Sequence, residues 1–152
     1  LCVAHVGDSR LYRLRDGRIE LLTEDHSVVQ ELLNRGLFTP EQARQSVSKN
    51  LVTRALGVEA HVQTDLSAHA TEPGDLYLLC SDGLNDVLTD MQIERLLAAH
   101  GADPNAAARR LVDAANQSGG PDNVSVILVR TDGRFRRTRK TAQKLLKKLG
   151  NA

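Results

Sequence analysis

The chain has 152 residues, 41% of them hydrophobic, which is enough for one domain with an apolar core. It holds only two Tyr, two Phe and no Trp, and this excludes a surface of stacked aromatic rings for single-stranded nucleic acid. The net charge of +1 is unevenly divided, because residues 1–133 hold 12 basic and 19 acidic residues (net −7) and residues 134–152 hold 8 basic residues and no acid. An acidic domain favours a cation site over a nucleic-acid site.

Residues 1–22 predict short antiparallel strands. Residues 1–6, 10–14 and 19–22 are apolar or alternating, and Asp16-Gly17 supplies a turn between the last two. We expect the three segments to form a meander. Since the chain opens inside an apolar segment at Leu1, it is also expected to be a fragment of something longer.

The next region predicts two helices. The first covers residues 28–35, after a cap at Asp25 or Ser27. The second begins at Thr39-Pro40 and runs to about residue 45. Residues 49–56 are ambiguous.

The rest of the chain predicts three strands and two helices. Strands are expected at 62–66, 76–80 and 124–129, and the run 76–80 is apolar enough for a buried central strand. Helices are expected from Thr89 or Asp90 to residue 99, and from Asp103-Pro104 onward with an apolar face. The predicted fold class is therefore α+β, with a mixed, largely antiparallel sheet and helices packed on one face.

Three acidic loops stand at strand ends, at residues 7–10, 81–86 and 119–123. Their carboxylates are Asp8, Asp82, Asp86 and Asp122. Carboxylates gathered at one end of a sheet repel one another unless a cation neutralises them, and such oxygen ligands suit Mg²⁺ or Mn²⁺ better than zinc. Asp-Gly and Asp-Asn pairs are also common turn formers. Each loop alone is more typical of a turn, and the three together leave the turn and the metal site as equal alternatives.

Five motifs in order give the chain a resemblance to a known family. The segments are Gly7-Asp8-Ser9-Arg10, Asp25-His26-Ser27, Leu51-Val52-Thr53-Arg54-Ala55-Leu56-Gly57, Gly74-Asp75 with Leu78-Leu79-Cys80-Ser81-Asp82-Gly83-Leu84, and Gly120-Pro121-Asp122-Asn123-Val124-Ser125-Val126. They resemble the GDSR, DH, LTRALG, GD…LLCSDGL and DNxSV segments of the metal-dependent type 2C (PPM) protein serine/threonine phosphatases. The order is similar to that of bacterial members.

The resemblance implies a β-sandwich of mainly antiparallel strands flanked by helices, with a two-metal centre of Mn²⁺ or Mg²⁺. In this family a metal-activated water attacks phosphoserine or phosphothreonine. By motif match, Asp82 and Asp122 would be ligands of the metal pair. Asp8 and Asp86 would help to hold a third, weaker ion near Asp82.

One departure from the family pattern limits the expectation. The family's first half carries an Asp-Gly-x-Gly-Gly loop, whose aspartate bridges the metals, and a phosphate-binding arginine. This sequence contains neither, so residues 1–131 correspond to the second half of a catalytic domain. We expect this chain alone to have little or no phosphatase activity. Residues 34–50 look like the family's flap, and His26 is expected to organise a turn rather than act as a general acid.

The remaining expectations concern partners and compartment. Cys2 and Cys80 lie outside zinc-binding spacings and fit a reducing, cytoplasmic compartment. The expected partners are phosphorylated proteins, targets of a serine/threonine kinase, and not nucleic acid. The basic tail, residues 132–152, is either a solvated extension or an amphipathic helix that touches a membrane or an acidic partner. Two alternatives remain: a non-catalytic regulatory or binding module of the same fold, and nucleic-acid binding through the tail.

Overall fold

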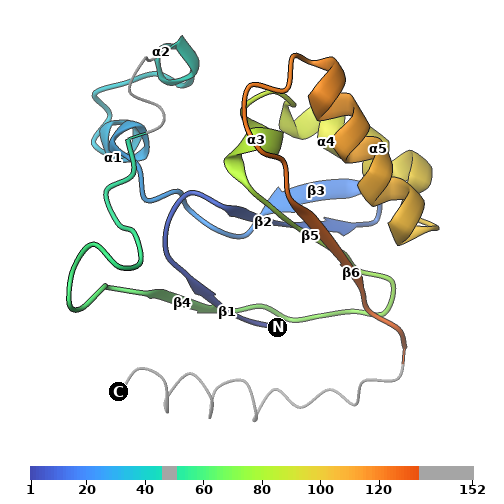
Figure 1. The fold of residues 1–152 in the computed structure, drawn as a ribbon. Coiled ribbons are helices and arrows are strands. Elements are labelled where there is room, and N and C mark those ends of the chain that lie inside the picture. Colours follow the sequence, from blue (N-terminus) through green and yellow to red (C-terminus); the bar gives the residue numbers. More distant parts are fainter. Residues whose placement is uncertain (46–50, 134–152) are drawn as a thin grey trace. The chain divides into compact units, whose positions relative to one another are not determined.

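The computed structural model describes residues 1–45 and 51–133. The chain divides into two compact units (Figure 1). The described part of the first unit contains residues 1–8, 24–45 and 51–68, and that of the second contains residues 9–23 and 69–133.

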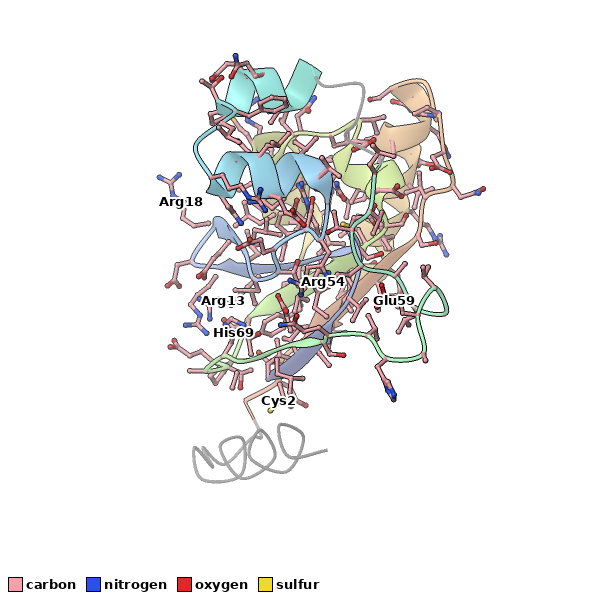
Figure 2. All side chains as sticks on the ribbon, turned by 90° about the vertical axis from the view of Figure 1, so that its left-hand side faces the viewer. Cys2, Arg13, Arg18, Arg54, Glu59 and His69 are labelled. Atoms are coloured by element: carbon pink, nitrogen blue, oxygen red, sulfur yellow. The ribbon has the colours of Figure 1, made fainter. Side chains whose placement is uncertain are left out.

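The second unit is built on a four-stranded antiparallel sheet in the order β3-β2-β5-β6. Its strands are β2 (Arg10–Arg15), β3 (Arg18–Leu21), β5 (Leu76–Cys80) and β6 (Val126–Arg130). Asp16 and Gly17 both have positive φ, 50° and 75°, which is the conformation that a two-residue hairpin turn requires. The hairpin β2-β3 follows from this pair, and Figure 2 labels Arg13 and Arg18, one on each of its strands.

Helices cover one face of this sheet (Figure 1). They are α3 (Asp82–Asn85), α4 (Asp90–His100) and α5 (Pro104–Gln117). Thr89 and Gln92 form a capping box at the start of α4, and the Asp103 side chain caps α5. The side chains between helices and sheet form the core, which includes the fully buried Tyr12, Leu78, Leu84, Ile93, Leu97 and Leu111. Because the core is mainly aliphatic, the few aromatic residues of the sequence suffice.

The other face of the same sheet carries exposed apolar side chains. Along β6, Val126 and Leu128 pack against the core, whereas Ile127 and Val129 are 60% and 48% exposed. Leu79 on β5 is exposed as well. This alternation is the normal period of a strand, and it leaves an apolar strip on the side of the sheet opposite α4 and α5.

An ion pair with a buried carboxylate joins β2 to the turn before β5. The Nε and Nη2 atoms of Arg15 lie 2.6 and 2.7 Å from the two carboxylate oxygens of Asp75, which is 1% exposed. Asp75 also accepts hydrogen bonds from the Glu72 N–H and the Tyr77 hydroxyl. Burial raises the pKa of Asp75, but the bonds from Arg15, Glu72 and Tyr77 together outweigh burial and lower the pKa to about 2.

The first unit contains a two-stranded antiparallel sheet and two short helices. Its strands are β1 (Cys2–His5) and β4 (Asp65–Ala68), paired from Cys2 with Ala68 to His5 with Asp65. Its helices are α1 (Val28–Asn34), capped by the Ser27 side chain, and α2 (Pro40–Gln45).

Several sequence expectations need correction. Residues 1–6 do not form a meander with the following strands, because β1 pairs with β4 and the chain bends at Gly7, where φ is +107°. The strand expected at 62–66 lies at 65–68, where the partner β1 supplies its hydrogen bonds. Residues 82–85 form a short helix rather than an open loop. The other strands and helices agree with the prediction within two or three residues, and the fold class is α+β as predicted.

Candidate metal-binding loops

Two of the predicted acidic loops meet at one end of the four-stranded sheet. Strands β5 and β6 are antiparallel neighbours, with Cys80 opposite Val126. The loop after β5 and the loop before β6 therefore lie side by side at the same end of the sheet. The Ser81 hydroxyl donates to the Asn123 carbonyl at 3.1 Å and accepts from the Ser125 N–H at 3.0 Å. The Ser81 N–H also donates to the Ser125 carbonyl. One serine therefore fastens the two loops together.

A glycine allows this close approach. A Cβ atom on Gly83 would lie 2.4 Å from the carbonyl oxygen of Asn123 and 3.0 Å from its carbonyl carbon. Backbone atoms cannot move aside as the end of a flexible side chain can. Gly83 is thus required by contact with the second loop, and its φ is not in the left-handed region.

The acidic side chains flank this junction. One carboxylate oxygen of Asp82 accepts from the Gly83 N–H at 2.8 Å, and one of Asp122 accepts from the Asn123 N–H at 2.6 Å. Asp86 follows α3, and its N–H donates to the Asp82 carbonyl at 2.8 Å. With a spacing of four residues, Asp82 and Asp86 lie on the same side of this helical turn. Asp82 is half-buried, and Asp86 and Asp122 are exposed.

Asp8 belongs to the first unit, directly after the bend at Gly7. Both backbone polar groups of Gly7 bond to His26: the Gly7 N–H donates to Nδ1 at 3.1 Å, and the Gly7 carbonyl accepts from the His26 N–H at 2.9 Å. His26 therefore organises this bend, as predicted.

The donor set fits the expected cations in its chemistry, because carboxylate oxygens on half-buried or exposed loops are the hard ligands that Mg²⁺ and Mn²⁺ prefer. Within residues 1–45 and 51–133, however, no three or more His, Cys, Asp or Glu side chains form a group that could hold a metal ion. The described loops thus offer Asp82 and Asp122 beside one junction, without a third ligand of these types to complete a site there.

Comparison with known proteins places the chain in a family. Residues 10–132 match the Stage II sporulation protein E (SpoIIE) family. The serine/threonine phosphatase stp of Listeria monocytogenes is 40% identical over 130 residues, which are 86% of this chain and 51% of that protein. The serine/threonine protein phosphatase PstP of Mycobacterium tuberculosis is 41% identical over 128 residues, which are 84% of this chain and 24% of that protein.

Solved structures agree with the sequence relatives. The serine/threonine phosphatase of S. agalactiae has a TM-score of 0.81 and 37% identity, over 86% of this chain and 54% of that one. The catalytic domain of PstP in complex with two manganese ions has a TM-score of 0.71 and 39% identity, over 86% of this chain and 53% of that one.

The chain belongs to the SpoIIE/type 2C family of protein serine/threonine phosphatases. The relatives named above are bacterial members of this family. It spans about half the length of the Listeria relative. The family resemblance expected from the five motifs is confirmed. In the part of the chain that the structure describes, no helix is both long and apolar enough to cross a membrane.

Proposed function

We propose that the chain is the second half of the catalytic domain of a Mn²⁺- or Mg²⁺-dependent phosphatase. This enzyme hydrolyses phosphoserine and phosphothreonine in proteins. In this proposal Asp82 and Asp122 are ligands of a metal pair, and Asp8 and Asp86 help to hold a third ion near Asp82. The observation that carries the proposal is the Ser81 junction, which holds the Asp82 and Asp122 loops side by side at the end of β5 and β6.

When bound, such ions lower the pKa of a coordinated water and neutralise phosphoryl oxygens. The residues of this chain position the ligands. The Gly83 N–H donates to one carboxylate oxygen of Asp82, and the Asn123 N–H donates to one of Asp122. Each bond restricts the direction in which the second oxygen points. The Ser81 hydroxyl sets the separation of the two loops.

We expect little or no phosphatase activity from this chain alone, because its sequence lacks the Asp-Gly-x-Gly-Gly loop of the family. Hydrolysis of p-nitrophenyl phosphate with Mn²⁺ tests this directly. We expect no turnover above the protein-free rate. Turnover by the unmodified chain would contradict the expected inactivity. If Asp82→Asn abolished that turnover, the result would still support Asp82 as a metal ligand.

A non-catalytic module of the same fold is the second candidate, and the lack of a three-ligand group among the described residues favours it. Calorimetric titration with Mn²⁺ separates the two. Asp113 is an exposed carboxylate on α5, so Asp113→Asn is the control. Weak Mn²⁺ binding that is lost in Asp82→Asn and retained in Asp113→Asn supports the phosphatase proposal. No binding by the unmodified chain supports the module.

The proposed partners are phosphorylated proteins, the targets of a serine/threonine kinase. A reducing, cytoplasmic location is supported by Cys2 and Cys80, neither of which forms a disulfide. The prediction that the tail touches a membrane or an acidic partner concerns residues 132–152, of which residues 134–152 lie outside the described part of the structure.

A further inference from the structure

His26 connects four segments of the first unit, and its ring is only 5% exposed. Its Nδ1 atom accepts from the Gly7 N–H at 3.1 Å, and its Nε2 atom lies 3.1 Å from the Asp65 carboxylate on β4. The ring of His5 on β1 packs against it, with centroids 4.9 Å apart. Both ring nitrogens therefore have partners inside the protein, and the ring is not placed to exchange a proton with a substrate.

These contacts fix the tautomer of the ring. Since the Gly7 N–H is a donor, Nδ1 must be the acceptor, and the ring proton of neutral His26 lies on Nε2 and is donated to Asp65. The hydrogen bond from His26 lowers the pKa of Asp65, and Arg54 lowers it further against the effect of burial. Asp65 is thus an ionised carboxylate that holds the ring in one orientation.

Arg54 completes the arrangement. Its Nη1 atom donates to the other oxygen of Asp65 at 2.8 Å and lies 3.3 Å from Nε2 of His26. Because Nη1 and Nε2 are both donors, the carboxylate between them is what holds them together. The Arg54 side chain is labelled in Figure 2.

Backbone bonds carry the connection to the start of α1. The Thr53 N–H donates to the His26 carbonyl at 2.7 Å, the Val28 N–H donates to the Leu51 carbonyl at 2.9 Å, and Ser27 pairs with Val52 in an isolated β-bridge. The residues on either side of His26 are therefore anchored to residues 51–53, independently of its ring.

We infer that His26 is a positioning residue, which holds the Gly7–Asp8 bend in its left-handed conformation through Nδ1 and is itself oriented by the Asp65–Arg54 ion pair. Gly7, with φ of +107°, has both its N–H and its carbonyl bonded to His26, and Asp8 is the next residue. The direction of the Asp8 carboxylate thus depends on residues 54 and 65, far along the chain. The inference rests on the proposed function only in treating Asp8 as a metal ligand.

Amide hydrogen exchange of Gly7 in the ¹⁵N-labelled full chain tests the inference. His26→Asn keeps an acceptor near the position of Nδ1, and His26→Gln places its amide nearer the position of Nε2. We expect Gly7 exchange near the wild-type rate in His26→Asn and about 10-fold faster exchange in His26→Gln, the effect of one lost hydrogen bond. His61→Asn, at an exposed histidine, is the matched control and should leave the rate unchanged.

Two further readouts keep the inference testable if His26→Gln fails to fold. Asp65→Ala changes a half-exposed side chain, and we expect Gly7 to exchange several-fold faster in it, since the ring loses its anchor. In the wild type, ¹⁵N spectra of the ring should show the proton on Nε2. A wild-type ring protonated on Nδ1 alone, or Gly7 exchange unchanged in both Asp65→Ala and folded His26→Gln, overturns the inference.

Mn²⁺ separates this inference from the proposed function. If the inference and the proposed function both hold, Mn²⁺ broadens the Asp8 amide in the wild type and in His26→Asn, and broadens it less in His26→Gln. If Mn²⁺ broadens no acidic loop in any variant while Gly7 exchange follows the expected pattern, the proposed metal role of Asp8 fails and the positioning role of His26 stands.

Discussion

Gly83 faces the backbone carbonyl of Asn123 so closely that a single methyl group on Gly83 would lie 2.4 Å from the oxygen. The contact joins the two loops that carry Asp82 and Asp122. The close approach of the two loops therefore depends on a residue that bears no side chain, together with the Ser81 hydroxyl.

Replacing Gly83 with alanine is expected to push the two loops apart. The clash is with backbone, so we expect a loss of roughly 1–3 kcal/mol in the free energy of unfolding, the usual cost of overpacking. Urea denaturation measures it. Gly133→Ala is the control, because its Cβ would meet Pro73 at an ordinary 3.8 Å and should cost little. Equal stability of the two variants would show that the loops are not in contact.

The Arg15–Asp75 pair should contribute measurably to the stability of the second unit. Asp75→Asn removes the charge that two Arg15 nitrogens bind, and it leaves the partly exposed guanidinium with only the exposed Glu72 carboxylate and the Ala70 carbonyl as partners. We expect a loss of about 3 kcal/mol, near the lower end for a broken buried pair because Arg15 is partly exposed. Thermal unfolding monitored by circular dichroism gives the value, with Asp113→Asn as the exposed control. A change no larger than that of the control would mean that the pair contributes little.

The same pair predicts a pH dependence. The pKa of Asp75 is lowered from 3.8 to about 2 in the folded chain, so its stabilising contribution is complete above pH 3.8 and is lost as the pH falls through 2. The difference corresponds to roughly 2 kcal/mol. Urea midpoints measured between pH 6 and pH 2 should therefore converge for wild type and Asp75→Asn as the pH falls. A gap that stays constant over this range would contradict the lowered pKa.

Local patterns in the sequence predicted some elements well. The run at Leu76–Cys80 predicts a strand with the bounds that the structure has, because a buried central strand is apolar throughout. The starts of helices α4 and α5 are predictable because Thr89, Asp103 and Pro104 are strong start signals.

Relationships between distant residues were not visible in the sequence. The pairing of β1 with β4 joins segments about sixty residues apart, and Arg15 meets Asp75 across sixty positions. Neither leaves a periodic signal. In the candidate site, the motifs point to the four aspartates. The roles of Ser81 and Gly83 depend on contacts with Asn123 and Ser125 that only the fold brings about. Gly74-Asp75 stands out in the sequence only as part of a family motif, and the motif does not identify Arg15 as the partner of Asp75.

The central claim is that Asp82 and Asp122 act together as metal ligands. Titration of the ¹⁵N-labelled chain with Mn²⁺ tests it residue by residue, because the ion broadens amide signals near the place where it binds. We predict selective broadening of the amides of residues 82–83 and 122–123, with loss of both sets in either Asp82→Asn or Asp122→Asn. Broadening confined to one loop, or unchanged in both variants, would contradict the account.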